Sequence, residues 1–175
     1  TGTGTGTLTI NGGGTFDNTN NFVNGYAVAS EYDLGTGIAT GTGTVTIRSG
    51  GLFNNSNSFE HGHAFGGGGF FGTGTATATG TVNIEAGGTF LNAASGTIRQ
   101  FAGSSFSNAG TFTNLGSLNG GTFTNEAGGL FQHSAGSAIG DSGDIAVINN
   151  GTFDIGYGSA SPATTALTGT FTQSS

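Results

Sequence analysis

The chain is built from short blocks in which apolar and polar positions alternate. Leu8-Thr9-Ile10 is one such block, and Val45-Thr46-Ile47 and Val82-Asn83-Ile84 repeat it. A period of two with β-branched residues predicts strands, because successive side chains of a strand point to opposite faces. A glycine pair soon follows each block and predicts a corner, since glycine adopts a positive φ at little cost. No stretch has a helical period, so we predict an all-β chain.

The blocks belong to a long internal repeat. Residues 6–42 align without gaps on residues 43–79, and 18 of the 37 pairs are identical. We therefore predict a solenoid with 37-residue repeats over residues 1–88. Short Gly-Thr-Phe units follow over 89–133, and less regular terminal coils occupy 134–175, with an irregular loop around Ser161-Pro162. We expect one continuous domain across these three segments.

A second regularity places Asn two positions after Phe. If consecutive coils lie in register, the stacked Phe rings fill the interior, and each Asn amide hydrogen-bonds the Asn of the next coil. Asn also tolerates the left-handed conformation of a corner. His61 and His133 take the Asn position in two of the pairs. The predicted ladder residues are Phe16, Phe53, Phe90, Phe112 and Phe123, with Asn18, Asn55, Asn92, Asn114 and Asn125.

These regularities together predict a parallel β-helix (β-solenoid) with stacked Phe and Asn ladders. An antiparallel sandwich gives no reason for a 37-residue copy in strict register. Composition agrees with a folded chain: it has 15 Phe, and charged residues make up only 6%. Disorder usually combines low hydrophobicity with high charge. The 38 glycines occur with a single proline and without a period of three, which excludes collagen.

Charge narrows the range of partners. The net charge is −7, and Arg48 and Arg99 are the only strongly cationic side chains. Binding to a phosphate backbone needs clustered cations, so we expect no nucleic acid partner. No apolar run approaches about 18 residues, so we expect no membrane insertion by this segment. The absence of cysteine excludes a disulfide scaffold.

Two phrases carry a resemblance to a known family. They are Gly-Thr-Val-Thr-Ile-Arg-Ser-Gly-Gly-Leu-Phe-Asn-Asn at 43–55 and Gly-Gly-Thr-Phe-Thr-Asn-Glu-Ala-Gly-Gly-Leu-Phe at 120–131. Both resemble the repeats in passenger regions of bacterial autotransporter adhesins and related filamentous-haemagglutinin-like surface proteins, and the resemblance covers most of residues 1–133. It implies a parallel β-helix that is exported to the bacterial surface and serves in adhesion or surface structure. The secretion signal and translocating barrel of such proteins are expected outside these residues.

Candidate metal sites are weak. His61-Gly62-His63 could bring two imidazoles to one ion, but a site needs three or four ligands. Gly140-Asp141-Ser142-Gly143-Asp144 resembles a calcium turn, with Asp141 and Asp144 as oxygen ligands, although it occurs once and a plain turn is favoured. No other cofactor is indicated.

An enzyme is not expected. Parallel β-helices also include polysaccharide-degrading enzymes, which use paired carboxylates, but only Glu31 and Asp33 share a strand face at short range in this sequence. A different alternative comes from the Thr rows at residues 3–7 and 73–79, which would form a flat array of the kind that ice-binding solenoids display.

The leading hypothesis is an extracellular or bacterial cell-surface protein that forms a rigid rod or a head-to-tail filament. Neither end of the sequence looks capped, and unpaired strand edges favour further pairing. Its partner would be itself or the neighbouring repeats of a longer chain, and a surface glycan or host receptor is a further candidate. The residues expected to take part in self-assembly are Thr1, Thr3, Thr5, Thr7, Leu8 and Ile10 at one end, and Leu167 and Phe171 at the other.

Overall fold

The computed structural model describes residues 1–31, 36–68, 73–140, 143–158 and 167–174, and these form strands, turns and bends without a helix. The strands in the part of the chain that is described are β1 (Gly2–Ile10), β2 (Thr15–Asn18), β3 (Phe22–Glu31), β4 (Thr36–Ile47), β5 (Leu52–Asn55), β6 (Ser58–Gly68), β7 (Thr73–Ile84), β8 (Thr89–Asn92), β9 (Thr97–Gln100), β10 (Ser105–Asn108), β11 (Thr111–Asn114), β12 (Ser117–Asn119), β13 (Thr122–Asn125), β14 (Leu130–Ser134), β15 (Ala138–Ile139), β16 (Ile145–Asn149), β17 (Thr152–Tyr157) and β18 (Gly169–Gln173).

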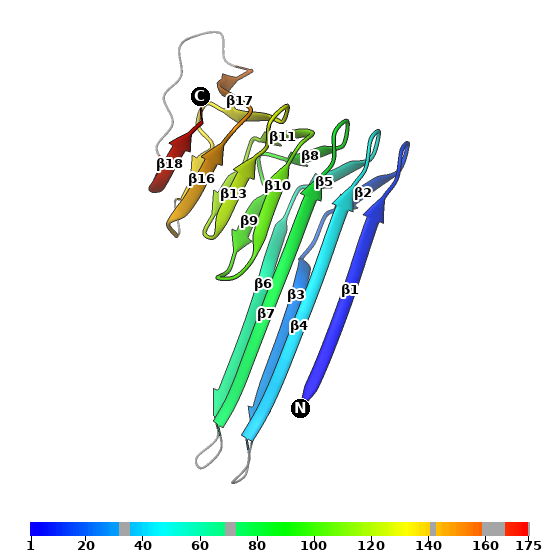
Figure 1. Cartoon of the computed structure of the whole chain (residues 1–175), viewed down its shortest axis with the longest axis vertical. Coiled ribbons are helices and arrows are strands. Elements are labelled where there is room, and N and C mark those ends of the chain that lie inside the picture. Colours follow the sequence, from blue (N-terminus) through cyan, green and yellow to red (C-terminus); the bar gives the residue numbers. More distant parts are fainter. Residues whose placement is uncertain (32–35, 69–72, 141–142, 159–166, 175) are drawn as a thin grey trace.

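The strands form three parallel sheets along one axis (Figure 1). Sheet A has the order β1-β4-β7-β10-β13-β16-β18, sheet B the order β17-β14-β11-β8-β5-β2, and sheet C the order β15-β12-β9-β6-β3. Each coil contributes one strand to each sheet in turn, so that β1, β2 and β3 make the first coil and β4, β5 and β6 the second. This is the predicted parallel β-helix, and the antiparallel sandwich is excluded.

The register explains the 37-residue repeat. Ile10 pairs with Ile47 and Ile47 with Ile84, so the repeat length is the length of one coil. Later coils are shorter: stacked asparagines are 22 residues apart at Asn92 and Asn114 and 17 apart at Asn108 and Asn125. The Gly-Thr-Phe units begin strands as predicted, at Thr89 of β8, Thr111 of β11 and Thr122 of β13.

Phenylalanine fills the interior of the coils. In sheet B, Phe16, Phe53, Phe90 and Phe112 stack in register, and the rings of Phe53 and Phe90 lie 4.6 Å apart at 11°. Phe123 belongs to sheet A, where it pairs with Phe106. The rings of neighbouring sheets meet in the middle, and a fully buried Phe contributes roughly 1.5–3 kcal/mol to stability. The completely buried rings are Phe53, Phe59, Phe90, Phe106, Phe112, Phe123 and Phe131.

Many corners turn at a glycine with a positive φ. Gly13, Gly50 and Gly87, the first of the paired glycines in each repeat, have φ values of +77°, +74° and +79°. Within the described residues no other residue type has a positive φ. The idea that Asn takes the left-handed conformation at corners is therefore wrong. Asn18, for example, is the last residue of the extended strand β2, and its side chain points inward and is buried.

The first coils extend beyond the solenoid as a two-layered arm. The long strands β1, β4 and β7 form one layer of it, and β3 and β6 form the other, as the blue to green strands in Figure 1 show. The layers touch through glycine and alanine. A Cβ added to Gly41 would lie 2.1 Å from the carbonyl oxygen of Tyr26, and one added to Gly74 would lie 2.3 Å from the carbonyl oxygen of Gly67. Because Gly and Thr alternate, each glycine presents only a Cα hydrogen to the facing layer, and each Thr side chain points outward.

Candidate functional site

The asparagine ladders lie inside the coils, where the side-chain amides hydrogen-bond one another. In sheet B the Nδ2 of Asn18 donates to Oδ1 of Asn55 at 2.7 Å, and Asn55 donates in the same way to Asn92 at 2.8 Å. A second ladder in sheet A joins Asn108, Asn125 and Asn149 at 2.7 Å per step. A third, in sheet C, joins Asn24 to His61. These side chains hold the coils in register and are not accessible to a ligand.

His61 is a member of a ladder. Asn24 Nδ2 lies 3.0 Å from His61 Nδ1, and His61 Nε2 lies 2.9 Å from the carbonyl oxygen of Ser105. An amide nitrogen can only donate, so Nδ1 accepts and Nε2 donates to the carbonyl. Burial lowers the pKa of His61 from 6.5 to about 4, although the bond to Ser105 partly opposes this shift. His61 is therefore neutral at pH 7.

The candidate metal ligands do not converge. His61 is completely buried inside the coil, whereas His63 lies on the outer face and is bonded to Glu60. Across the described parts of the chain, no three His, Cys, Asp or Glu residues are grouped so that they could hold a metal ion. In the expected calcium turn, Asp144 is exposed and Asp141 lies outside the described residues.

The other predicted positions fall partly outside the described residues. Asp33 and the loop around Ser161-Pro162 are in the parts that are not described, as is the side chain of Glu31. The carboxylate pair considered for an enzyme is therefore untested.

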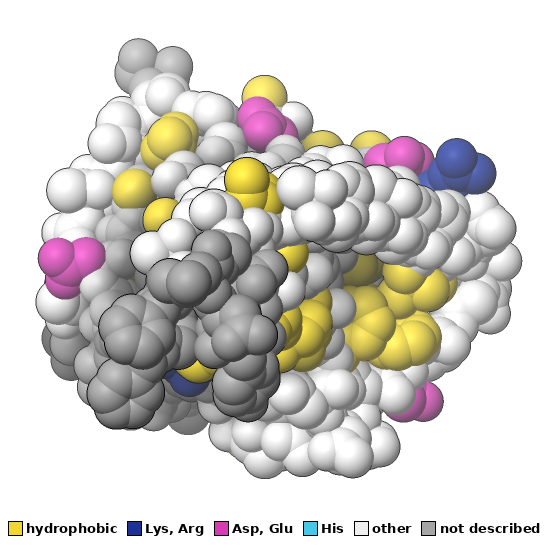
Figure 2. Space-filling model, turned by 90° about the horizontal axis from the view of Figure 1, so that it is seen from below, with side chains coloured by type: hydrophobic (Ala, Val, Ile, Leu, Met, Phe, Trp, Pro, Cys, Tyr) yellow, Lys and Arg dark blue, Asp and Glu magenta, His cyan; other side chains and the backbone are white. Residues whose placement is uncertain are grey.

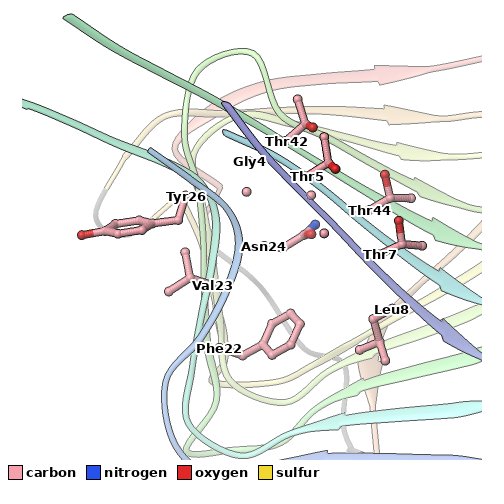
Figure 3. A pocket seen from close by; sticks show the side chains of 13 residues that line it. Gly4, Thr5, Thr7, Leu8, Phe22, Val23, Asn24, Tyr26, Thr42 and Thr44 are labelled. Carbon is pink, nitrogen blue, oxygen red and sulfur yellow. The ribbon is translucent and has the colours of Figure 1, made fainter. Parts of the chain in front are cut away.

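The threonines form a regular grid on the outer face of sheet A. Each row runs across β1, β4 and β7, and the residues of a row are paired in the sheet register. Neighbours are about 4.8 Å apart across strands and about 6.7 Å apart along a strand. Figure 3 shows Thr5, Thr7, Thr42 and Thr44 pointing away from the inside of the arm. The rows are Thr3-Thr40-Thr77, Thr5-Thr42-Thr79 and Thr7-Thr44-Thr81.

The first coil leaves an open apolar end. Phe16, Phe22 and Leu8 are only partly buried there, although the Phe53 and Phe59 rings of the next coil are fully buried. Leu8, Phe22 and Thr5 help to line a cavity of about 370 Å³ between the two layers of the arm (Figure 3). Figure 2 looks along the arm from below and shows hydrophobic side chains in the hollow between the layers.

Most of the residues predicted for self-assembly lie at the two edges of sheet A. Thr3, Thr5, Thr7, Leu8 and Ile10 lie on β1, which is the first strand of the sheet, and Thr1 precedes it. At the far edge, Phe171 lies on β18 and is 43% exposed. Leu167 forms a bridge to Ile139 at the end of sheet C.

Sequence analysis missed a cluster on the outer face of sheet C. Tyr26, His63 and Phe101 come from three successive coils, and His63 and Phe101 stack at 4.7 Å and 10°. Glu60 and Arg99 lie beside them in the register of β6 and β9. The 37-residue alignment places Tyr26 opposite His63 and was the one available signal. Phe101 is out of that phase, because the register of β6 with β9 joins residues 39 positions apart, as in Phe59 and Ile98.

Comparison with known protein families, with curated proteins and with solved structures found no match to this chain. Among the described residues, none belongs to a helix of sufficient length and apolar character to cross a bilayer.

Proposed function

We propose that this chain is an extracellular structural and adhesive repeat protein that forms a rigid rod or a head-to-tail filament on the bacterial surface or in its matrix. The observation that carries this proposal is the in-register stacking of coils up to an open first coil. In sheet B, consecutive coils place Phe at matching positions from Phe16 to Phe153, so the surface of the first coil is complementary to one more coil of the same kind.

The partner that packs on the open end of the first coil is another coil of the same repeat. It belongs either to a second copy of the chain or to neighbouring repeats of a longer chain. Sheet A ends in β1 on one side and in β18 on the other, and both have the strand direction that a parallel continuation needs. An unpaired strand edge pairs readily with another strand. Rod length then grows with the number of coils.

Adhesion and surface location rest on the resemblance of residues 43–55 and 120–131 to the repeats of autotransporter passenger regions. A rod suits that role because each coil is paired with its neighbours through three parallel sheets. Immunogold labelling of intact producing cells tests the location. Labelling only after the cells are broken open would contradict it.

The experiment for the rod is negative-stain microscopy of the purified chain and of two variants. Leu8→Arg places a charge inside the open end, and Thr9→Arg places the same charge one residue later on the exposed outer face of β1. We expect filaments for the parent chain and Thr9→Arg, and discrete particles for Leu8→Arg, with equal circular dichroism for all three. Discrete particles of the parent chain would refute the head-to-tail filament.

Ice binding is the second candidate function, because of the threonine grid on sheet A. Its flat rows expose hydroxyl and methyl groups at even spacing on three strands. Growth of seeded ice crystals in the presence of the chain tests it. Absence of thermal hysteresis and of recrystallisation inhibition removes this candidate.

A further inference from the structure

Two cavities on the outer face of sheet C meet at an aromatic stack. The first has a volume of about 320 Å³ and is lined by Val23, Tyr26, Glu60 and His63, among others. The second has a volume of about 180 Å³. It is lined chiefly by Arg99, Gln100, Phe101 and Asn119. Because His63 of the first stacks on Phe101 of the second at 4.7 Å, the cavities form one surface across β3, β6 and β9.

A glycine with a positive φ precedes Tyr26 and His63. Along β3, Asn24 points into the coil, and Gly25 then has φ +78°, so that Tyr26 is exposed and Ala27 is buried again. Gly62 has φ +77° at the equivalent place in β6. Because both strands carry the glycine, β3 and β6 stay in register on either side of it.

Polar groups of both signs lie next to the rings. Glu60 pairs with Val23 on one side and Arg99 on the other in the sheet register. Glu60 Oε2 is 2.5 Å from His63 Nδ1, and the guanidinium carbon of Arg99 lies 5.6 Å from the centre of the Phe101 ring. Tyr26 is 55% exposed and contacts His63 edge-on at 5.7 Å. The surface thus offers an aromatic wall together with one carboxylate and one guanidinium, whose charges balance.

Gln100 lies behind this surface. It is 6% exposed and stands next to the buried His61 in the sheet C register, so its side chain points into the coil, whereas Arg99 points outward. Its Nε2 and Oε1 have no hydrogen-bond partner among the described residues, because the next coil brings Gly120 and Gly121 close to it instead of another amide. The ligand surface is therefore formed by the outward side chains alone.

From this geometry we propose that the outer face of sheet C binds a neutral oligosaccharide. A sugar ring has an apolar C–H face that packs on an aromatic ring, whose π face is negatively polarised. Its hydroxyl groups both donate and accept, which suits the carboxylate of Glu60 and the guanidinium of Arg99. The site carries little net charge and so does not favour an anionic or cationic ligand. This inference rests on the proposed adhesive function and names the ligand class and the residues.

The test is calorimetric titration of the full chain with three neutral hexasaccharides: cellohexaose, chitohexaose and maltohexaose. We expect saturable binding of at least one, with a dissociation constant of roughly 1 mM or tighter. Tyr26→Ala is expected to weaken that binding at least about tenfold. Arg99→Gln, at an exposed position, is expected to weaken it as well without a change in folding.

The matched control is Tyr157→Ala, because Tyr157 is also exposed but lies on β17 of sheet B. Binding by this variant should equal that of the parent chain. No saturable heat with any of the three sugars, or equal weakening by Tyr26→Ala and Tyr157→Ala, would overturn the site. Microscopy of the same samples separates this result from the rod: filaments that bind no sugar refute the site alone, and sugar binding by discrete particles refutes the filament alone.

Discussion

The side-chain amide of Asn55 donates a 2.8 Å hydrogen bond to the side-chain oxygen of Asn92, one coil and 37 residues further along the chain. Asn55 also accepts from Asn18 at 2.7 Å and is fully buried. The Nδ2 of Asn55 also donates to the carbonyl oxygen of Thr97 at 3.4 Å. A buried amide whose side-chain partners are its copies above and below specifies which residue stacks on which. The ladder therefore encodes the register of the solenoid.

Replacement of Asn55 by Ala should destabilise the fold, because the stacked Asn18 and Asn92 lose hydrogen bonds to it. Asn92 loses its donor, and Asn18 loses one of its two acceptors and keeps the carbonyl oxygen of Ser58. An unsatisfied buried polar group costs about 1–3 kcal/mol. We expect a loss of about 2–5 kcal/mol in the free energy of unfolding, measured by urea denaturation. Asn20→Ala, at an exposed position of the first coil, is the control and should change stability by less than about 0.5 kcal/mol. Equal midpoints for the two variants would contradict the ladder's role.

Stability should fall as the pH drops from 7 to 5. Burial lowers the pKa of His61, and also that of His133, from 6.5 to about 4. Between these two values the unfolded chain binds more protons than the folded chain, so stability is fully present above pH 6.5 and is lost as the pH falls towards 4. The expected loss is about 2 kcal/mol for each histidine between pH 7 and pH 5.

Asn is the natural replacement in this test, because it occupies the equivalent ladder positions of the other coils. His61→Asn should remove half of the pH dependence, and the double variant with His133→Asn should remove nearly all of it. A pH dependence that persists in the double variant would assign the effect to other groups.

The glycines of the arm should not tolerate a side chain. In Gly41→Ala the new Cβ would meet the backbone oxygen of Tyr26 at 2.1 Å, and neither layer can move without breaking strand pairing. Overpacking of this kind costs about 1–3 kcal/mol. Gly4→Ala is the control, since nothing lies within 4 Å of its Cβ position. Thermal melting by circular dichroism should show a lower midpoint for Gly41→Ala alone, and an unchanged midpoint would mean that the layers are not in close contact.

Truncation of Phe90 should show how much the ring stack contributes. Phe90 is fully buried and lies 4.6 Å from Phe53 and 5.6 Å from Phe112. Removal of such a ring leaves a cavity and costs about 3–5 kcal/mol. Phe171→Ala, at a ring that is 43% exposed, should cost much less in the same urea titration. A cost for Phe90→Ala no greater than that for Phe171→Ala would argue against a continuous aromatic core.

How much could be predicted from the sequence depends on the repeat. The pairs Phe16/Phe53 and Asn18/Asn55 were readable because a coil that stacks on its copy places identical residues side by side, so sequence identity at a fixed shift is itself a record of contacts. The same logic identified His61 as a ladder residue in place of Asn.

The cluster on sheet C shows where this approach fails. Tyr26, His63 and Phe101 are three different residues, and the register shift is 37 residues from β3 to β6 but 39 from β6 to β9, so no fixed shift connects them. Their outward direction depends on the positive φ of Gly25 and Gly62, and these glycines look like any others in a glycine-rich chain. The lack of hydrogen-bond partners at the Gln100 amide likewise depends on the next coil, which places Gly120 and Gly121 beside it.

The sequence by itself determined the all-β character, the length of the first coils and the residues that stack within them, because backbone pairing of parallel copies depends only on periodicity. The tertiary structure alone decided the rest: which strands extend into a two-layered arm, that Phe123 lies in a different sheet from Phe112, and which side chains meet on the outer face. Those features depend on the angle at each corner and on bulges within strands, where a single glycine conformation changes which face a side chain occupies.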